Sequence, residues 1–82
     1  MKFKSVAAAI GWYAQAGGDR KEHNGSALVA VAIREALNSV GADQDRLVTH
    51  LLHGRRLAWN DLRTRRALQR FRARLVAEDL LD

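Results

Sequence analysis

The stretch SALVAVAIREALNSV, residues 26–40, decides the fold because it is the most apolar long segment of the chain. Val29, Ile33 and Leu37 recur on one face at helical spacing. The alternation of Val29, Val31 and Ile33 also fits a β-strand, but the helix formers that follow, ending at Leu37, favour a helix. We therefore predict a central helix over residues 26–40, with a broad buried face.

Three further helices are predicted on either side of this segment, over residues 4–16, 43–53 and 60–78. Gly17, Gly41 and Gly54 lie at the expected helix ends, and the chain has no proline. Asp43 and Asn60 are the expected N-caps of the last two helices. The expected core residues of the three helices are Phe3, Val6, Ile10 and Tyr13; Leu47, Val48, Leu51 and Leu52; and Leu68, Phe71 and Leu75.

Together these patterns predict an all-α fold. Residues 1–82 are expected to form a small single domain, a bundle of about four helices with a long arginine-rich C-terminal helix. The apolar content of 48% is that of a folded chain. The absence of cysteine excludes disulfides and thiolate metal sites, which suits the cytoplasm. The longest apolar run, residues 27–33, is too short to span a membrane. A basic helix could also lie on an anionic membrane surface, but the narrow apolar stripe of the last helix is expected to pack in the core, so no membrane association is expected.

Positive charge is concentrated in one part of the chain. Eight arginines and one acidic residue, Asp61, lie between Arg55 and Arg74, which gives this stretch a formal charge of +7 in a chain whose total is +5. Such a local field attracts phosphates or acidic protein surfaces. The expected partner is therefore DNA or RNA, or an acidic surface of a larger protein.

Helical geometry gathers four of these arginines. At 100° per residue, Arg63, Arg66, Arg70 and Arg74 fall within about 80° of one another and form what we call the arginine ridge. The ridge contains no acid, so its guanidinium groups are expected to be mostly unmatched within their own helix. Two more arginines fall on the other flank of the helix and two in the turn before it. The candidate nucleic-acid-binding residues are Arg55, Arg56, Arg63, Arg65, Arg66, Arg70, Arg72 and Arg74.

The predicted function is that of a non-enzymatic regulatory protein that binds nucleic acid through this ridge. A helix-turn-helix fits poorly, because residues 54–59 make a longer turn than the usual three or four residues. An arginine-rich helix in a groove of structured RNA is a second mode, supported by composition alone. The alternative function is a small inhibitor or adaptor that docks on an acidic protein surface, as a phage or mobile-element accessory protein would. A solvated face without a ligand is the simplest interpretation of the same pattern.

Trp12 is the candidate protein-contact residue, since it lies off the Phe3, Val6 and Ile10 face of its helix. Packing against another element is the alternative for Trp12, and an exposed position would favour a protein partner or a homodimer. Catalytic patterns are missing: His50 and His53 lie one turn apart without a cysteine. Histidines at that spacing are typical of a helix surface or end. We predict no enzyme activity, no cofactor and no metal site.

Overall fold

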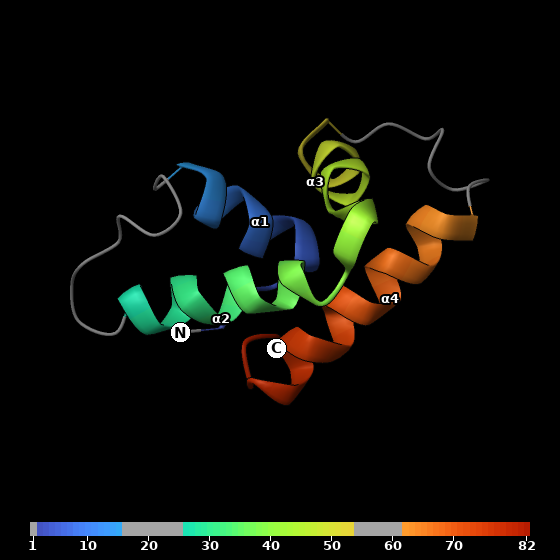
Figure 1. The fold of residues 1–82 in the computed structure, drawn as a ribbon. Helices are drawn as coiled ribbons and strands as arrows, with labels where there is room; N and C mark the ends of the chain where they lie inside the picture. The colour runs from blue at the N-terminus through green and yellow to red at the C-terminus, as the bar shows by residue number, and fades with distance from the viewer. Residues whose placement is uncertain (1, 16–25, 54–61) are drawn as a thin grey trace.

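The structure is a computed structural model that describes residues 2–15, 26–53 and 62–82 of the 82-residue chain. These residues form four α-helices: α1 (Val6–Gln15), α2 (Ser26–Asn38), α3 (Gln44–His53) and α4 (Leu62–Ala77). A short 3₁₀ helix, η2 (Gly41–Asp43), leads directly into α3. Helix α1 packs on α2 and α3, and α4 closes the bundle against α2 and α3 (Figure 1). The predicted all-α bundle is confirmed, including the helix at residues 27–33.

One hydrophobic core joins the four helices. Ile10 of α1, Ile33 of α2, Leu47 of α3 and both Phe71 and Leu75 of α4 are fully buried. Burial of a large apolar side chain contributes about 1.5–3 kcal/mol relative to its exposed state. These residues were expected in the core from helical spacing, whereas Leu52, which shares the predicted stripe of α3, is exposed.

The first helix begins two residues later than predicted because Ser5 caps it. The backbone N–H of Ala8 donates a hydrogen bond to Ser5 Oγ at 3.0 Å, which satisfies one of the free donors of the first turn. Helix α1 therefore starts at Val6 instead of residue 4. The predicted end at Gly17 lies outside the described residues.

The second helix ends at Asn38, two residues before its predicted end, because the chain turns at Gly41. Gly41 has a φ of 72°, a left-handed conformation that glycine adopts without strain. Ser39 Oγ donates to the carbonyl of Ala36 at 2.6 Å, and Gln44 Nε2 donates to the carbonyl of Leu37 at 3.1 Å. The carbonyl of Leu37 also accepts from the N–H of Val40 at 3.0 Å. Together these bonds close the end of α2 and fix the direction in which η2 leaves it.

The fourth helix, predicted over residues 60–78, is described from Leu62 to Ala77 and ends in a Schellman motif. The N–H of Leu80 donates to the carbonyl of Leu75 at 2.9 Å, and the N–H of Asp79 donates to that of Val76 at 3.0 Å. Asp79 takes the left-handed position of the motif, with a φ of 58°. The predicted cap Asn60 lies outside the described residues.

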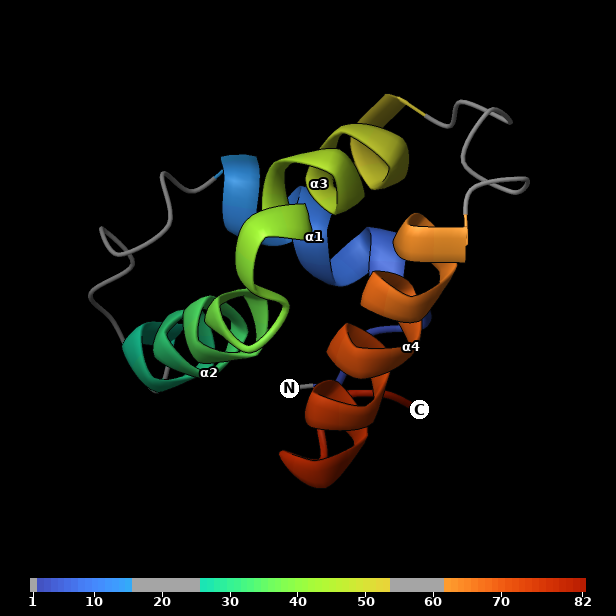
Figure 2. The same cartoon turned by 45° about the vertical axis from the view of Figure 1, so that its right-hand side comes forward.

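The two ends of the chain lie side by side, as Figure 2 shows. Phe3 and Leu81 form an isolated parallel bridge, in which the N–H of Phe3 donates to the carbonyl of Leu80 at 2.8 Å. Lys2 Nζ lies 3.0 Å from Asp79 Oδ1, and this hydrogen bond raises the pKa of Lys2. The bridge anchors the residues that follow α4 and so holds the C-terminal end of that helix against the bundle.

Candidate nucleic-acid interface

The rotation of α4 about its axis is set by four buried side chains. Thr64, Ala67, Phe71 and Leu75 are buried and recur at helical spacing. Thr64 has a bonding partner, so the polar atom that it brings into the core is satisfied. With this face fixed toward α2 and α3, the remaining faces of α4 are exposed to solvent.

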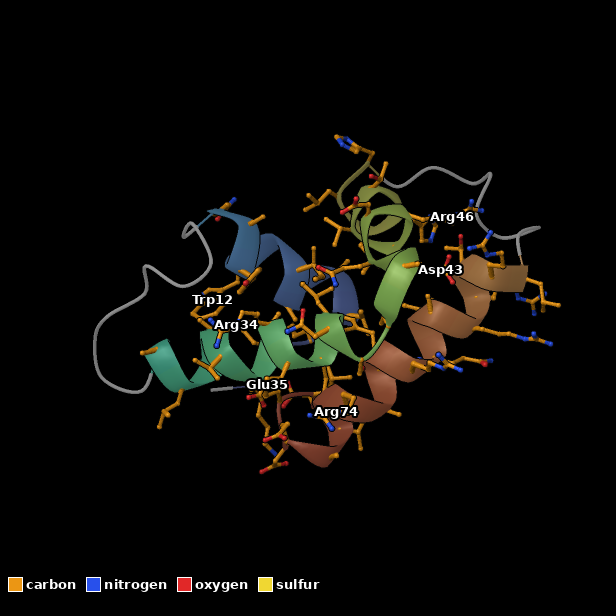
Figure 3. The ribbon with its side chains drawn as sticks, viewed as in Figure 1. Trp12, Arg34, Glu35, Asp43, Arg46 and Arg74 are labelled. Carbon is orange, nitrogen blue, oxygen red and sulfur yellow. The ribbon has the colours of Figure 1, made fainter. Side chains whose placement is uncertain are left out.

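The four arginines of the ridge lie on one exposed flank of α4, as helical spacing predicts. Arg63, Arg66, Arg70 and Arg74 are all exposed. Figure 3 shows Arg74 on the part of α4 beside α2 and shows Asp43 opposite the beginning of α4. The flank therefore faces solvent along the side of α4 that borders α2 and η2.

Arg63 has an acidic partner on another element, a contact on which the prediction for its own helix is silent. Its Nη2 lies 2.8 Å from Asp43 Oδ1, in a hydrogen-bonded ion pair between α4 and η2. The side chain of Arg63 is 64% exposed and that of Asp43 is 25% exposed, so the pair lies at the rim of the bundle. A pair this exposed is worth about 0–1 kcal/mol. Its main effect is to neutralise the first arginine of the ridge.

The other three arginines of the ridge keep their full charge. Within residues 2–15, 26–53 and 62–82, Arg66, Arg70 and Arg74 form no hydrogen bond or ion pair. Each is four residues from the next, and like charges at this spacing destabilise a helix by about 0.2–0.5 kcal/mol per pair. The ridge thus costs the folded protein stability that a bound anion would restore.

A shallow hollow of about 190 Å³ lies beside the ridge, where α4 meets η2 and the residue just before η2. Three arginines of the ridge line it together with one carboxylate and two apolar side chains. The lining residues are Val40, Asp43, Arg63, Arg66, Ala67 and Arg70. Arg66 and Arg70 bring positive charge to its edge, while Asp43 is already paired with Arg63. The hollow therefore favours anionic groups.

The remaining candidate arginines are divided between two places. Arg65 and Arg72 are exposed on the opposite flank of α4, and we call them the second arginine row. They also form no hydrogen bond or ion pair in the part of the chain that the structure describes. Arg55 and Arg56 lie outside the described residues. Helix α4 alone holds six arginines and no acidic residue.

Trp12, the candidate protein-contact residue, packs against the core in the structure. The centroid of its ring lies 5.5 Å from that of the Phe3 ring, with an angle of 54° between the ring planes. Trp12 is half-buried. Tilted aromatic pairs at this separation add about 0.5–1.5 kcal/mol beyond the area that they bury. The contact with Phe3 thus buries part of the Trp12 side chain, as the packing alternative expects. The exposed part is the surface to which the prediction of a protein contact still applies.

The histidines do not form a metal site among the described residues. His50 lies in the last turn of α3, as the helix-end alternative expects, but it is only 9% exposed, so the surface alternative is wrong for it. Its place three residues after Leu47, on the apolar stripe of α3, is the sequence signal for burial. It has a bonding partner, and no buried side-chain polar atom in the described ranges is unsatisfied. These ranges also contain no group of three or more histidine, aspartate or glutamate residues placed to hold a metal ion.

None of the described helices combines the length and the apolar character that crossing a bilayer requires. Comparison of the chain with protein-family models, with curated proteins and with solved structures gives no match. Inference about function therefore starts from the charge and geometry of α4.

Proposed function

We propose that this protein is a non-enzymatic regulatory protein that binds nucleic acid through the arginine ridge of α4. The observation that carries the proposal is the state of Arg66, Arg70 and Arg74, which lie on one exposed flank without an ion pair in the described residues. Phosphates of a nucleic acid backbone offer regularly spaced negative charge to such a flank.

The type of cation supports phosphate as the ligand. A guanidinium group is planar and donates two parallel hydrogen bonds, so it matches the oxygens of a phosphate better than an ammonium group does. Ridge arginines that are four residues apart are separated by about 6 Å along the axis of α4, because each residue rises 1.5 Å. Neighbouring phosphates of one strand are separated by a similar distance, so successive arginines contact successive phosphates.

Release of condensed counterions supplies the free energy of such binding. Each phosphate that a side chain neutralises on B-form DNA changes the slope of log affinity against log salt by about −0.9. Arg66, Arg70 and Arg74 together contribute about −2.7 on this basis. Arg63 contributes less than a full unit because Asp43 competes for its guanidinium group.

The test compares a ridge variant with a variant of equal charge. Arg66→Gln, Arg70→Gln and Arg74→Gln together remove three positive charges from the ridge. The control, Gln15→Glu, Ala27→Glu and Leu28→Glu, lowers the net charge by the same amount at the end of the bundle away from α4 (Figure 1).

Fluorescence anisotropy with labelled duplex DNA and hairpin RNA measures both variants at one salt concentration. The proposal predicts that the ridge variant loses binding to the preferred nucleic acid while the control keeps most of it. Equal loss in both variants would show a response to net charge alone. Failure of the unmodified protein to bind either nucleic acid would contradict the proposal and favour an acidic protein surface as the partner of the ridge.

A further inference from the structure

The solvent side of α4 is open along the whole helix. Opposite the buried face, Leu62, Gln69, Ala73 and Val76 are exposed, with Leu62 at 55% and Val76 at 60%. In both views of the ribbon, α4 forms an edge of the bundle and no other described helix lies outside it (Figures 1 and 2). A partner can therefore approach this side of α4 without displacing another helix.

Arginines border this open side on both flanks. The ridge lies along one edge, and the second arginine row, Arg65 and Arg72, lies along the other. At 100° per residue the centres of the two rows are about 150° apart around the helix axis. The strip between them carries no charge, because Gln69 and Ala73 occupy it. Helix α4 therefore presents a neutral strip between two positive edges.

This arrangement of a neutral strip between two charged rows matches that of a groove of duplex DNA. A groove of B-form DNA presents base edges on its floor and a row of phosphates on each side. An α-helix with its side chains is about 10–12 Å across, and the major groove is about 12 Å wide. Over its 16 residues α4 is roughly 24 Å long, enough to follow the groove over several base pairs.

The residues of the neutral strip suit base edges. The amide of glutamine pairs with the N6 and N7 atoms of adenine through two hydrogen bonds, and an alanine methyl group contacts the methyl group of thymine. Gln69 and Ala73 are four residues apart and thus lie one turn from each other on the strip. The deep and narrow major groove of regular A-form RNA does not admit a helix in this way.

We infer that α4 lies in the major groove of double-stranded DNA, with Gln69 and Ala73 facing base edges and the two arginine rows contacting the phosphates of opposite strands. This inference rests on the proposed function and specifies its ligand as duplex DNA. Binding through one strand requires the ridge alone, whereas insertion into the groove requires Arg65 and Arg72 as well.

The first experiment measures the second arginine row. Arg65→Gln with Arg72→Gln is compared with the charge-matched control Gln15→Glu with Ala27→Glu, by anisotropy on labelled duplex DNA across salt concentrations. Groove insertion predicts that the double arginine variant loses about tenfold or more in affinity at physiological salt and about 1.8 units of salt slope, since two phosphate contacts disappear. The control is expected to keep the slope of the unmodified protein. Each variant is expected to fold, because all substituted positions are exposed on helices. Circular dichroism checks this.

The second experiment measures the neutral strip. Selection of binding sequences from a randomised duplex pool is expected to enrich adenine or thymine at one or two positions, and Gln69→Ala is expected to reduce that enrichment about tenfold without changing the salt slope. Methylation by dimethyl sulfate, which reports access to guanine N7 in the major groove, is expected to fall in the bound region.

The outcomes separate this inference from the proposed function. If the ridge variant loses DNA binding while Arg65→Gln with Arg72→Gln binds as the unmodified protein does, α4 contacts one strand only and the inference is overturned while the function stands. Preference for hairpin RNA, or self-association through Leu62 and Val76 that excludes DNA, also overturns it. Absence of binding to every nucleic acid overturns both.

Discussion

Reversing one charge of the ridge is expected to stabilise the fold while it weakens binding. Arg70 is four residues from both Arg66 and Arg74. In Arg70→Glu, two repulsive pairs become two attractive pairs, and each pair is worth about 0.2–0.5 kcal/mol in either direction. The sum lies near 1–2 kcal/mol, and Asp43, which lines the same hollow as residue 70, opposes the new carboxylate. We therefore expect a gain of about 1 kcal/mol at low ionic strength.

The chain supplies a matched control for this prediction. Arg72 lies on the other flank of α4, and its neighbours three and four residues away are Leu68, Gln69, Leu75 and Val76, none of which is charged. Arg72→Glu makes the same change of net charge in the same helix without relieving any repulsive pair. The difference in stability between the two variants therefore isolates the energy of the pairs that Arg70 makes.

Thermal unfolding followed by circular dichroism measures this difference. In a domain of this size, 1 kcal/mol corresponds to a shift in Tm of about 4–8 °C. We expect Arg70→Glu to unfold at a Tm higher than that of the unmodified protein by about this amount at low salt, and Arg72→Glu to stay near the original Tm. The gain should shrink as salt rises, because the Debye length falls to about 10 Å at 0.1 M. A lower Tm for Arg70→Glu than for Arg72→Glu would refute the reasoning, since it would mean that Arg70 stabilises the folded state.

Three further changes test other contacts. Asp43→Asn removes the carboxylate that pairs with Arg63 and is expected to tighten nucleic acid binding and steepen the salt slope by up to about 0.9, measured by anisotropy; an unchanged slope would place Arg63 outside the interface. Asp79 has a φ of 58°, so substitutions there test the left-handed position. In urea unfolding the glycine variant is expected to be more stable than the asparagine variant, and the asparagine variant more stable than the alanine variant, with about 1 kcal/mol between glycine and alanine, because alanine tolerates this conformation least. An alanine variant as stable as the glycine variant would contradict this. Trp12→Ala removes the ring that packs on Phe3 and is expected to destabilise the fold by about 2 kcal/mol in the same assay while the salt slope of nucleic acid binding stays the same; an undiminished stability would show that this packing contributes little.

The helices and the core were predictable because both follow from the spacing of apolar residues within each helical segment. Ile33, Leu47 and Phe71 recur with their neighbours at three and four residues, and the structure buries all three. Helix ends were less predictable, since they depend on individual side chains. Ser5 caps α1, so that helix does not extend to residue 4. Gln44 donates to the carbonyl of Leu37 at the end of α2, a contact that helical spacing does not report.

The arrangement of the ridge followed from the sequence, whereas its partners did not. Helical spacing placed Arg66, Arg70 and Arg74 on one flank because all three lie in one helix. The pairing of Arg63 with Asp43 joins residues 20 positions apart on different elements, and no periodicity within α4 reports it. The hollow beside the ridge depends on the same tertiary contact between α4 and η2, so it too required the structure.

The salt dependence of nucleic acid binding tests the central role of the ridge most directly. We would measure log affinity against log salt on a duplex of about 20 base pairs, long enough to cover α4, for the unmodified protein and for Arg66→Gln with Arg70→Gln and Arg74→Gln. The two slopes are predicted to differ by about 2.7, which corresponds to three lost phosphate contacts. Identical slopes, or no binding by the unmodified protein at any salt concentration, would contradict the role of the arginine ridge as a nucleic-acid interface.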